Sequence, residues 1–429
     1  MEILADPLRR RWLGWAAVAG AFSLFSFHRV STSVIAADLM AAFDATGTEL
    51  GFLHASLFYI YAATQMPAGA LADRLGIRRI ATIGTLVMGI GAVGFALSDR
   101  YVLSFLARAV LGLGGSVLYI SALRYCANWF RSDEFATMTG LTSAMAGVGG
   151  ILATTPLAIA VAGYGWRPTL LALGLFGVVV ATIIHLVVDD TPADAGFDPI
   201  DGAPPTPETT LATVTENART ILRDPATWLL GGVFLAFVGT TFTVLGLWGV
   251  PFLVDRYGLS VQRASQYVLL GNVGFLLGPP AMGRLSDRLG IRTPIVVGAA
   301  VLFTLGYGLI ALVGTPPLLV VGGVLFGATF VGGAGFITFA LVKERHPPGA
   351  SGTATGAVNS LGFFGVATLP AIMGWILDNF WTGETVAGAR VYTLLGYRAA
   401  FGVAAAMGVI ALVGSAWYWR RARAAAAGS

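Results

Sequence analysis

The sequence predicts an all-α membrane protein with twelve transmembrane helices arranged as two six-helix bundles. Three observations predict this fold class. Hydrophobic residues make up 56% of the 429 residues and charged residues only 11%, whereas soluble domains carry about 25% charged residues. Apolar runs long enough to cross a bilayer recur along the chain. The two halves of the chain also share a repeated motif. So few charges cannot cover a soluble surface, and most of the surface is therefore expected to face lipid.

The apolar runs place six helices in each half of the chain. The expected spans are 12–38, 50–72, 79–98, 101–129, 134–162 and 166–188 in the first half, and 226–254, 263–285, 294–313, 316–342, 350–378 and 395–419 in the second. The intervening stretch is rich in Pro, Thr and Asp, which predicts a linker with a short surface helix at 208–223. The expected domains are a bundle over 1–188, a linker over 189–225 and a bundle over 226–429.

Arginines in the short loops predict the orientation. They are concentrated on one side of the twelve-span arrangement and sparse on the other, and the positive-inside rule places the rich side in the cytoplasm. The apolar run that follows Arg9–Arg11 continues to Leu39, which is too long for a signal peptide and predicts an uncleaved first helix. We therefore expect a multi-pass protein of the bacterial inner membrane with both termini and the linker in the cytoplasm.

One loop motif occurs twice, between the second and third spans and between the eighth and ninth. Residues 69–78 are Gly-Ala-Leu-Ala-Asp-Arg-Leu-Gly-Ile-Arg, and residues 283–292, half the chain length later, are Gly-Arg-Leu-Ser-Asp-Arg-Leu-Gly-Ile-Arg. A second match at nearly the same offset pairs 137–140 with 353–356. Parallel six-helix repeats are typical of transporters, whose substrate site lies near the membrane midplane between the repeats.

The charged residues of this motif are candidates for a cytoplasmic latch. Its aspartates can accept hydrogen bonds at a helix N-terminus, and its arginines can pair with carboxylates of neighbouring loops. The alternative is that the motif combines topology charges with a tight turn. The gating candidates are Asp73, Arg74, Arg78, Asp287, Arg288 and Arg292, together with Arg124 near the predicted cytoplasmic end of span 101–129.

The doubled loop motif resembles the signature of the major facilitator superfamily, and the resemblance covers the whole chain. Gly165-Trp166-Arg167 and Trp129-Phe130 match the superfamily as well. The resemblance implies two six-helix bundles related by pseudo-two-fold symmetry, which transport their substrate by rocking alternating access.

Within that superfamily the chain is most similar to the anion-cation symporter group. Tyr61-x-x-x-Gln65-x-Pro67 leads into the first loop motif, Arg29 lies near the middle of the first span, and Arg108 lies in the fourth, four residues before a glycine. In that group two such arginines and the tyrosine line an anion site. The chain departs from the group at its two membrane acids, the expected proton carriers, which are replaced here by His28 and Gly115.

Charged residues inside the predicted spans point to the chemistry of the substrate. A charge in the bilayer core is costly and is rarely kept without a function. The candidates His28, Arg29, Arg108 and Arg124 are all basic and all lie in the first half, and no Asp or Glu falls near the middle of any span. A cationic site without carboxylates favours an anionic ligand. Because histidine titrates near neutral pH, His28 is the candidate for proton coupling, with a neutral, hydrogen-bonded histidine as the alternative.

The candidate substrate-binding residues are Arg29, His28, Tyr61, Arg108 and Asn359. Asn359 is included because the eleventh span is rich in glycine around it. The structural alternatives are an Arg29 bonded to backbone carbonyls, an Arg108 that stabilises the fold, and an Asn359 that only joins two helices.

These observations favour a secondary active transporter that moves a small organic anion, such as a carboxylate, by alternating access. Uptake by symport with protons is the leading hypothesis. The alternatives are a proton-coupled drug or metabolite exporter of the same fold, a uniporter or exchanger, and a non-transporting sensor, which would need a larger output domain than 189–225 supplies. The sequence carries no P-loop and no catalytic or metal-binding pattern, so neither an enzyme nor a cofactor is expected.

The expected partners are the anion, a co-transported proton and the lipid bilayer. Nucleic acid is not expected, and the chain is expected to act as a monomer.

The orientation can be tested with reporter fusions. Green fluorescent protein fused after Ser429, or inserted within 199–218, should fluoresce, and alkaline phosphatase at the same places should be inactive, because the arginine-rich loops are expected to stay in the cytoplasm. A phosphatase insertion within 382–388, on the opposite side, is the positive control. Active phosphatase after Ser429 would contradict the predicted orientation.

Overall fold

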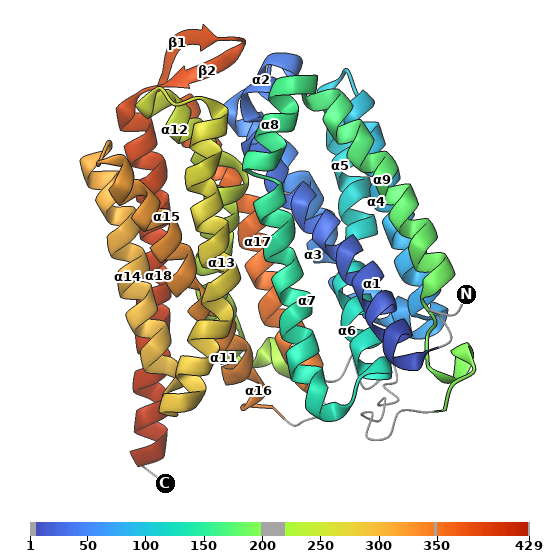
Figure 1. The fold of residues 1–429 in the computed structure, drawn as a ribbon. Coiled ribbons are helices and arrows are strands. Elements are labelled where there is room, and N and C mark those ends of the chain that lie inside the picture. Colours follow the sequence, from blue (N-terminus) through green and yellow to red (C-terminus); the bar gives the residue numbers. More distant parts are fainter. Residues whose placement is uncertain (1–5, 199–218, 347–349, 428–429) are drawn as a thin grey trace. The chain divides into compact units, whose positions relative to one another are not determined.

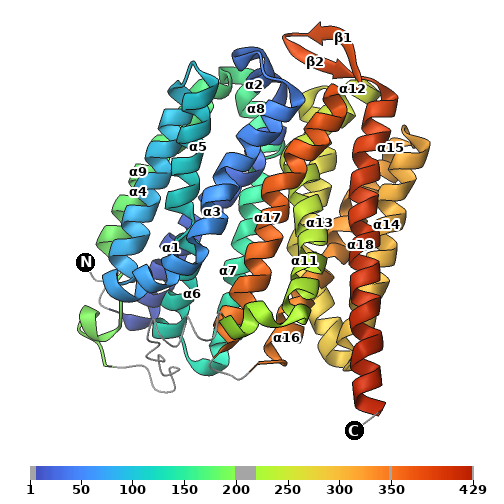
Figure 2. The ribbon, with the colours of Figure 1, turned by 180° about the vertical axis from the view of Figure 1, so that it is seen from behind.

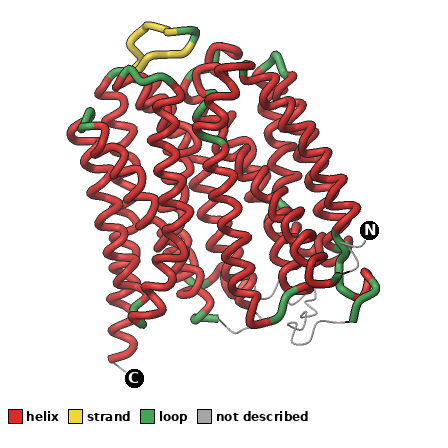
Figure 3. The backbone as a smooth tube through the Cα atoms, viewed as in Figure 1, coloured by secondary structure: helices red, strands yellow, loops and turns green. Residues whose placement is uncertain are grey.

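The computed structural model describes residues 6–198, 219–346 and 350–427, without the side chains of 65–74, 132, 133, 136, 351, 352 and 425–427. The described chain is almost entirely helical (Figure 1 and Figure 3). It forms two compact units, Met1–Ser31 with Ser56–Glu208, and Thr32–Ala55 with Thr209–Ser429. The boundary after Glu208 falls inside the predicted linker, whereas the segment Thr32–Ala55 belongs to the second unit. The predicted domains 1–188, 189–225 and 226–429 remain a prediction.

The first unit contains the helices of the first half of the chain. They are α1 (Pro7–Val30), the later part of α3 (Gly47–Leu75), α4 (Ile77–Leu97), α5 (Tyr101–Gly115), α6 (Leu118–Trp129), α7 (Ser132–Leu152), α8 (Thr155–Tyr164) and α9 (Trp166–Val187), with a 3₁₀ turn at Ala193–Ala195. Helix α4 packs against both α5 and α9, and α1 packs against α6 and α7.

The second unit contains the remaining elements. They are α2 (Ala36–Phe43), the start of α3, α11 (Pro225–Thr243), α12 (Gly249–Tyr257), α13 (Val261–Leu289), α14 (Arg292–Val313), α15 (Leu318–Gly332), α16 (Ile337–Lys343), α17 (Ser351–Asp378), β1 (Trp381–Val386), β2 (Ala389–Tyr392) and α18 (Leu394–Ala427). Helix α11 packs along α17, and α14 packs along α18 (Figure 2). Of the predicted surface helix at 208–223, residues 219–223 are helical and the rest lies outside the described residues.

Each predicted span coincides with one helix or with consecutive helices joined across a short break. Within the described residues, nine such segments are long and apolar enough to cross a membrane. The other three predicted spans correspond to α1 and α13, which carry more polar residues, and to α3, part of which is outside the described side chains. The prediction of an all-α protein with twelve spanning helices is therefore confirmed, apart from the small hairpin of β1 and β2.

Several spans are broken in ways that the sequence analysis did not predict. A 3₁₀ turn at Ser31–Ser33 follows α1, and the hydroxyl of Ser31 donates to the carbonyl of His28 at 3.2 Å. Between α5 and α6, the hydroxyl of Ser116 donates to the carbonyl of Leu113 at 2.7 Å. A carbonyl released at a helix break has no water to bond in a bilayer, and nearby Ser and Thr hydroxyls can satisfy it. The span 226–254 is interrupted by a π-helix at Val244–Trp248.

The hairpin after α17 was missed by the sequence analysis, which treated this stretch as a loop. Strands β1 and β2 are antiparallel, and Val386 pairs with Ala389. The two residues between them, Ala387 and Gly388, have positive φ angles of 51° and 80°. Tight two-residue hairpin turns require such angles and favour glycine, so the Ala-Gly pair was the available signal.

Glycines set how closely the helices of the first unit approach one another. A Cβ at Gly112 on α5 would lie 2.2 Å from the carbonyl oxygen of Leu57 on α3, and one at Gly149 on α7 would lie 2.0 Å from the carbonyl oxygen of Ser23 on α1. Membrane helices rely on such small residues for close packing, because lipid provides no hydrophobic driving force between them. Gly112 and Gly149 therefore fix the distances of α3 and α1 from their neighbours.

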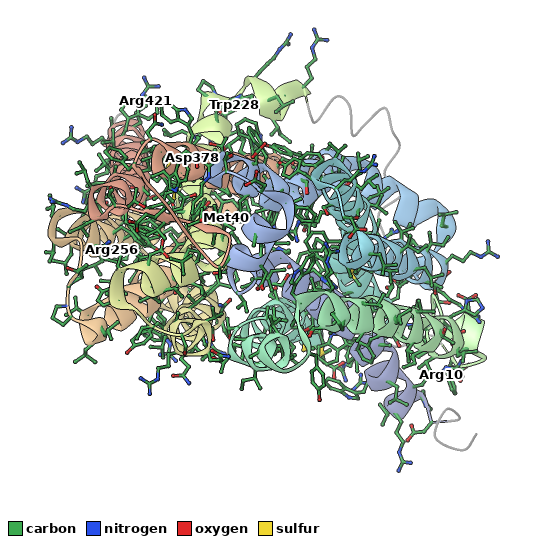
Figure 4. All side chains as sticks on the ribbon, turned by 90° about the horizontal axis from the view of Figure 1, so that it is seen from above. Arg10, Met40, Trp228, Arg256, Asp378 and Arg421 are labelled. Carbon is green, nitrogen blue, oxygen red and sulfur yellow. The ribbon has the colours of Figure 1, made fainter. Side chains whose placement is uncertain are left out.

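The N-terminus of α3 is capped by a carboxylate from a distant part of the chain. Asp378, at the end of α17 (Figure 4), accepts hydrogen bonds from the backbone amides of Gly47 and Thr48 at 2.7 and 2.8 Å, and from the Thr48 hydroxyl at 2.6 Å. Arg390 on β2 lies 3.5 Å from the same carboxylate. A negative charge at a helix N-terminus is stabilised by the free amides there. This contact holds the start of α3 against the end of α17 within the second unit.

Removal of this cap should destabilise the protein. Asp378→Ala leaves the first amides of α3 without their acceptor and should lower the free energy of unfolding by about 1–2 kcal/mol, the usual cost of a lost helix cap. Thermal melting of the purified protein in detergent measures the loss. Glu384→Ala, on the exposed strand β1, is the matched control. Equal melting temperatures for the two variants would contradict a capping role.

Candidate substrate-binding site

Arg29 lies near the end of α1 and is surrounded by aromatic rings of the first unit. Its side chain is buried, with 4% exposure. Its guanidinium carbon lies 5.8 Å from the ring centroids of Phe25 and Phe58 and 6.0 Å from that of Tyr61. Phe25 stacks on Tyr61 with 5.4 Å between centroids. Cation–π attraction acts over such distances, so the three rings stabilise the buried cation. Arg29 and Tyr61 were both predicted site residues, and the structure brings them together.

His28 and Arg108 are two further basic residues of the same unit. Both are buried, and Arg108 lies on α5. The Arg108 guanidinium carbon also lies 5.2 Å from the ring centroid of Phe95 on α4. The Nε2 atom of His28 is buried and has no hydrogen-bond partner in the part of the chain that the structure describes. His28 therefore presents a buried ring nitrogen, a type of group that can exchange a proton.

Gly115 explains one departure from the symporter group. Gly115 lies seven residues after Arg108, on the same face of α5, and a Cβ there would lie only 2.0 Å from Cδ2 of Phe25. Any side chain at this position would displace the Phe25 ring. The place where the resembling group carries a glutamate is thus occupied here by an aromatic ring that contacts Arg29.

Asn359, the fifth predicted site residue, lies on α17 in the second unit and is half-buried. Its position beside Arg29 therefore remains a prediction. Sequence reasoning missed Phe25 and Phe58 as neighbours of Arg29. Phe25 lies four residues before Arg29, one helical turn away on the same face, and that spacing was the signal that could have identified it.

The first loop motif is joined to the end of α9. The carboxylate of Asp190 accepts a hydrogen bond from the backbone amide of Arg78 at 2.7 Å, and so caps α4. The side chain of Arg78 donates to the carbonyl of His185 at 2.7 Å and lies 3.8 Å from Asp189, which also pairs with Arg10. The carboxylate that caps α4 therefore belongs to Asp190, which lies outside the loop motif. Of the other gating candidates here, Asp73 and Arg74 have side chains outside the described residues.

The second loop motif makes an equivalent connection within the second unit. Arg292 pairs with Glu344, at the end of α16, at 2.9 Å. The next residue, Arg345, pairs at 2.9 Å with Asp224, which caps α11. Partial burial alone would raise the pKa of Asp224, but hydrogen bonds from Arg345 and the Ala226 amide, with the charge of Arg345, hold it below its ordinary value. The motif arginine thus joins α14 to the end of α16.

Three gating candidates, Asp287, Arg288 and Arg124, are not part of the two connections described above. Asp287 and Arg288 are exposed at the end of α13 and form no ion pair with another described residue, and Arg124 is half-buried on α6. Sequence reasoning did not identify Asp189, Asp190, Asp224 or Glu344 as partners of the loop arginines. All four follow or precede predicted spans, where carboxylates can reach helix ends, but their partners lie far away in the sequence.

Comparisons with known proteins place this geometry in a family. The family model described as Major Facilitator Superfamily matches residues 16–370. The chain is 25% identical over 397 residues to a probable hexose phosphate transport protein of Chlamydia trachomatis, with 85% of each chain covered. It is 26% identical over 390 residues to the cis,cis-muconate transport protein of Acinetobacter baylyi, covering 86% of this chain and 91% of the relative. It is also 25% identical over 396 residues to the membrane sensor protein UhpC of Escherichia coli, covering 87% and 86%.

A solved structure agrees with the fold. A bacterial homologue of the human lysosomal transporter Spinster superposes with a TM-score of 0.75 at 19% identity, and covers 96% of this chain and 97% of its own. The predictions of a transport protein rather than an enzyme, and of a resemblance to anion symporters, are confirmed by these matches. On the family match over most of its length, the chain belongs to the major facilitator superfamily of membrane transporters.

Proposed function

We propose that this protein is a secondary transporter that takes up a small organic anion by alternating access, with Arg29 binding the anionic group. The observation that carries the proposal is the buried guanidinium of Arg29 among the rings of Phe25, Phe58 and Tyr61. Arginine suits the role because its planar fork can form two parallel hydrogen bonds to a carboxylate or phosphate.

The relatives support an anionic substrate. Their names specify hexose phosphate, cis,cis-muconate and, for a protein of Cupriavidus necator, sulfoacetate. All three compounds are anions, although their bodies differ widely. They share a negatively charged group that a buried arginine can bind, and this is the property we transfer to the present chain.

We infer that uptake is coupled to protons through His28. The residue is buried and adjacent in the sequence to Arg29 on α1, and the acids used by the resembling symporters are absent at the corresponding positions. A histidine can carry a proton near neutral pH, and its place beside the anion-binding residue would link the proton to the substrate. The loop arginines Arg78 and Arg292, with their carboxylate partners, would favour one conformation during the cycle.

A sensor is the second candidate function, because UhpC relatives are named membrane sensor proteins. A sensor of this fold would bind its anion without moving it across the membrane. Uptake of a bound anion into proteoliposomes distinguishes the two candidates. An exporter, a uniporter and an exchanger are distinguished by the direction of net movement and its response to a pH gradient.

Substitution of Arg29 tests the binding role. Arg29→Ala should weaken the affinity for an anion by about ten- to a hundredfold, because a charge-assisted hydrogen bond contributes roughly 1.5–3 kcal/mol. Arg29→Lys keeps the charge but loses the planar fork of the guanidinium. Its affinity for the anion should therefore lie between those of the unchanged protein and Arg29→Ala. Calorimetric titration of purified protein with benzoate, cis,cis-muconate and glucose 6-phosphate measures the change.

The matched control for Arg29→Ala is Arg421→Ala, an arginine exposed near the end of α18 (Figure 4). It should leave the affinity unchanged. An affinity of Arg29→Ala within about twofold of the unchanged protein would place the anion site elsewhere, with Arg108 as the next candidate.

Substitution of His28 tests the coupling. His28→Gln cannot carry a proton, so it should abolish accumulation driven by an inward proton gradient and leave exchange of labelled for unlabelled substrate intact. Both are measured in proteoliposomes with the anion that binds best. His185→Gln, near the end of α9, is the matched control. Accumulation that continues undiminished in His28→Gln would remove this histidine from the coupling mechanism.

A further inference from the structure

We propose that Phe25, Phe58 and Tyr61 make the Arg29 site selective for carboxylates carried on a flat, apolar body, either aromatic or conjugated, over phosphorylated sugars. This inference rests on the proposed function, in which Arg29 binds the anionic group of the substrate. We call these three residues the aromatic collar.

The collar follows from helical spacing on two helices that face each other. Phe25 and Arg29 are four residues apart on α1, and Phe58 and Tyr61 are three residues apart on α3, so each pair shares one helix face. The stacking of Phe25 on Tyr61 joins the two faces, with 5.4 Å between ring centroids. All three collar residues are buried, with exposures of 0–3%. The rings are therefore held in place before any substrate arrives.

Glycines create the space that the collar occupies. Gly112 lets α5 approach α3 at Leu57, and Gly115, one turn further along the same face, lies directly against the Phe25 ring. A glutamate at position 115 and the observed position of Phe25 exclude each other. Where the resembling group carries a glutamate, an aromatic ring therefore lies near Arg29 in this chain.

The chemistry of the collar favours some anions over others. A guanidinium binds a carboxylate through N–H groups in its own plane, and a flat apolar body can then stack on neighbouring rings. A sugar has many hydroxyls, and each one that is buried against Phe25 or Phe58 loses water without gaining a partner. A phosphate monoester also carries up to two negative charges, and the negative faces of the aromatic rings disfavour this charge more than the single charge of a monocarboxylate. Arg108, also buried in this unit, lies over the ring of Phe95 on α4.

Three probes of different shape test the selectivity on the purified full-length protein. Benzoate is a flat aromatic carboxylate, lactate is a carboxylate of the same charge without a ring, and glucose 6-phosphate is a phosphorylated sugar. Benzoate should bind at least about tenfold more tightly than either of the others by calorimetric titration.

Two substitutions test whether the collar causes this preference. Phe25→Leu removes the flat ring but keeps an apolar side chain, and should weaken benzoate about three- to tenfold, the range expected for one aromatic contact, while lactate stays within about twofold. Gly115→Ala places a Cβ against the Phe25 ring and should act in the same direction. Phe176→Leu, an exposed phenylalanine on α9, is the matched control and should change neither affinity. Melting curves establish that each variant is folded.

The outcomes separate this inference from the proposed function. Glucose 6-phosphate binding as tightly as benzoate would overturn the selectivity alone, as would equal losses of benzoate and lactate in Phe25→Leu. Failure of all three probes to bind, or affinities that do not respond to Arg29→Ala, would overturn the proposed anion site and the selectivity with it.

Discussion

The close approach of α1, α3 and α5 through glycine is the constraint on which the first unit depends. Gly112 brings α5 to within contact of the α3 backbone, and Gly149 does the same for α7 and α1. Larger residues at these positions would separate the helices by several tenths of an ångström or more. These contacts hold close together the helices that carry the buried side chains of Arg29, Tyr61 and Arg108, and in lipid such packing is one of the main attractions between helices.

Carboxylates at helix ends provide the second layer of organisation. Asp190 caps α4, Asp378 caps α3 and Asp224 caps α11. Asp190 and Asp378 come from the ends of other helices, so each links two helices that are distant in the sequence. The loop arginines form ion pairs with carboxylates close to these caps, as Arg78 does with Asp189, the residue before Asp190. A conformational change that moves one of these helices must break charge-assisted hydrogen bonds, which are stronger than neutral ones.

The sequence was sufficient to predict the twelve spans, because an apolar run long enough to cross the bilayer has few other structures open to it. Breaks such as Ser31–Ser33 were not predicted, since they depend on single hydroxyls that bond to nearby carbonyls. The hairpin of β1 and β2 was missed because its strands are short and exposed. The motif arginines were identified from their repetition, but their carboxylate partners were not, because pairing between Arg292 and Glu344 depends on how the helices pack.

In the candidate site, too, single residues could be predicted from the sequence, whereas contacts between residues on different helices could not. Arg29 and Tyr61 could be identified because a charge and a matching tyrosine stand out in apolar spans. The role of Gly115 could not, because in the sequence it is only a missing acid. In the structure the space beside this glycine holds the ring of Phe25, which contacts both the glycine and the cation. The absence of a side chain at position 115 and the observed position of the Phe25 ring are therefore linked.

In the proposed function, α1 carries both the residue that binds the anion and the residue that binds the proton. With the acid absent, a proton that travels with the substrate needs another carrier in this unit, and His28 is adjacent to Arg29 in the sequence. Successive residues on a helix point about 100° apart, and Arg29 is the one of the two whose guanidinium lies among the collar rings. The group that would bind the proton and the group that would bind the anion thus lie on neighbouring faces of one helix. Movement of α1 would carry both together, so the loss of the acid need not separate proton movement from anion movement.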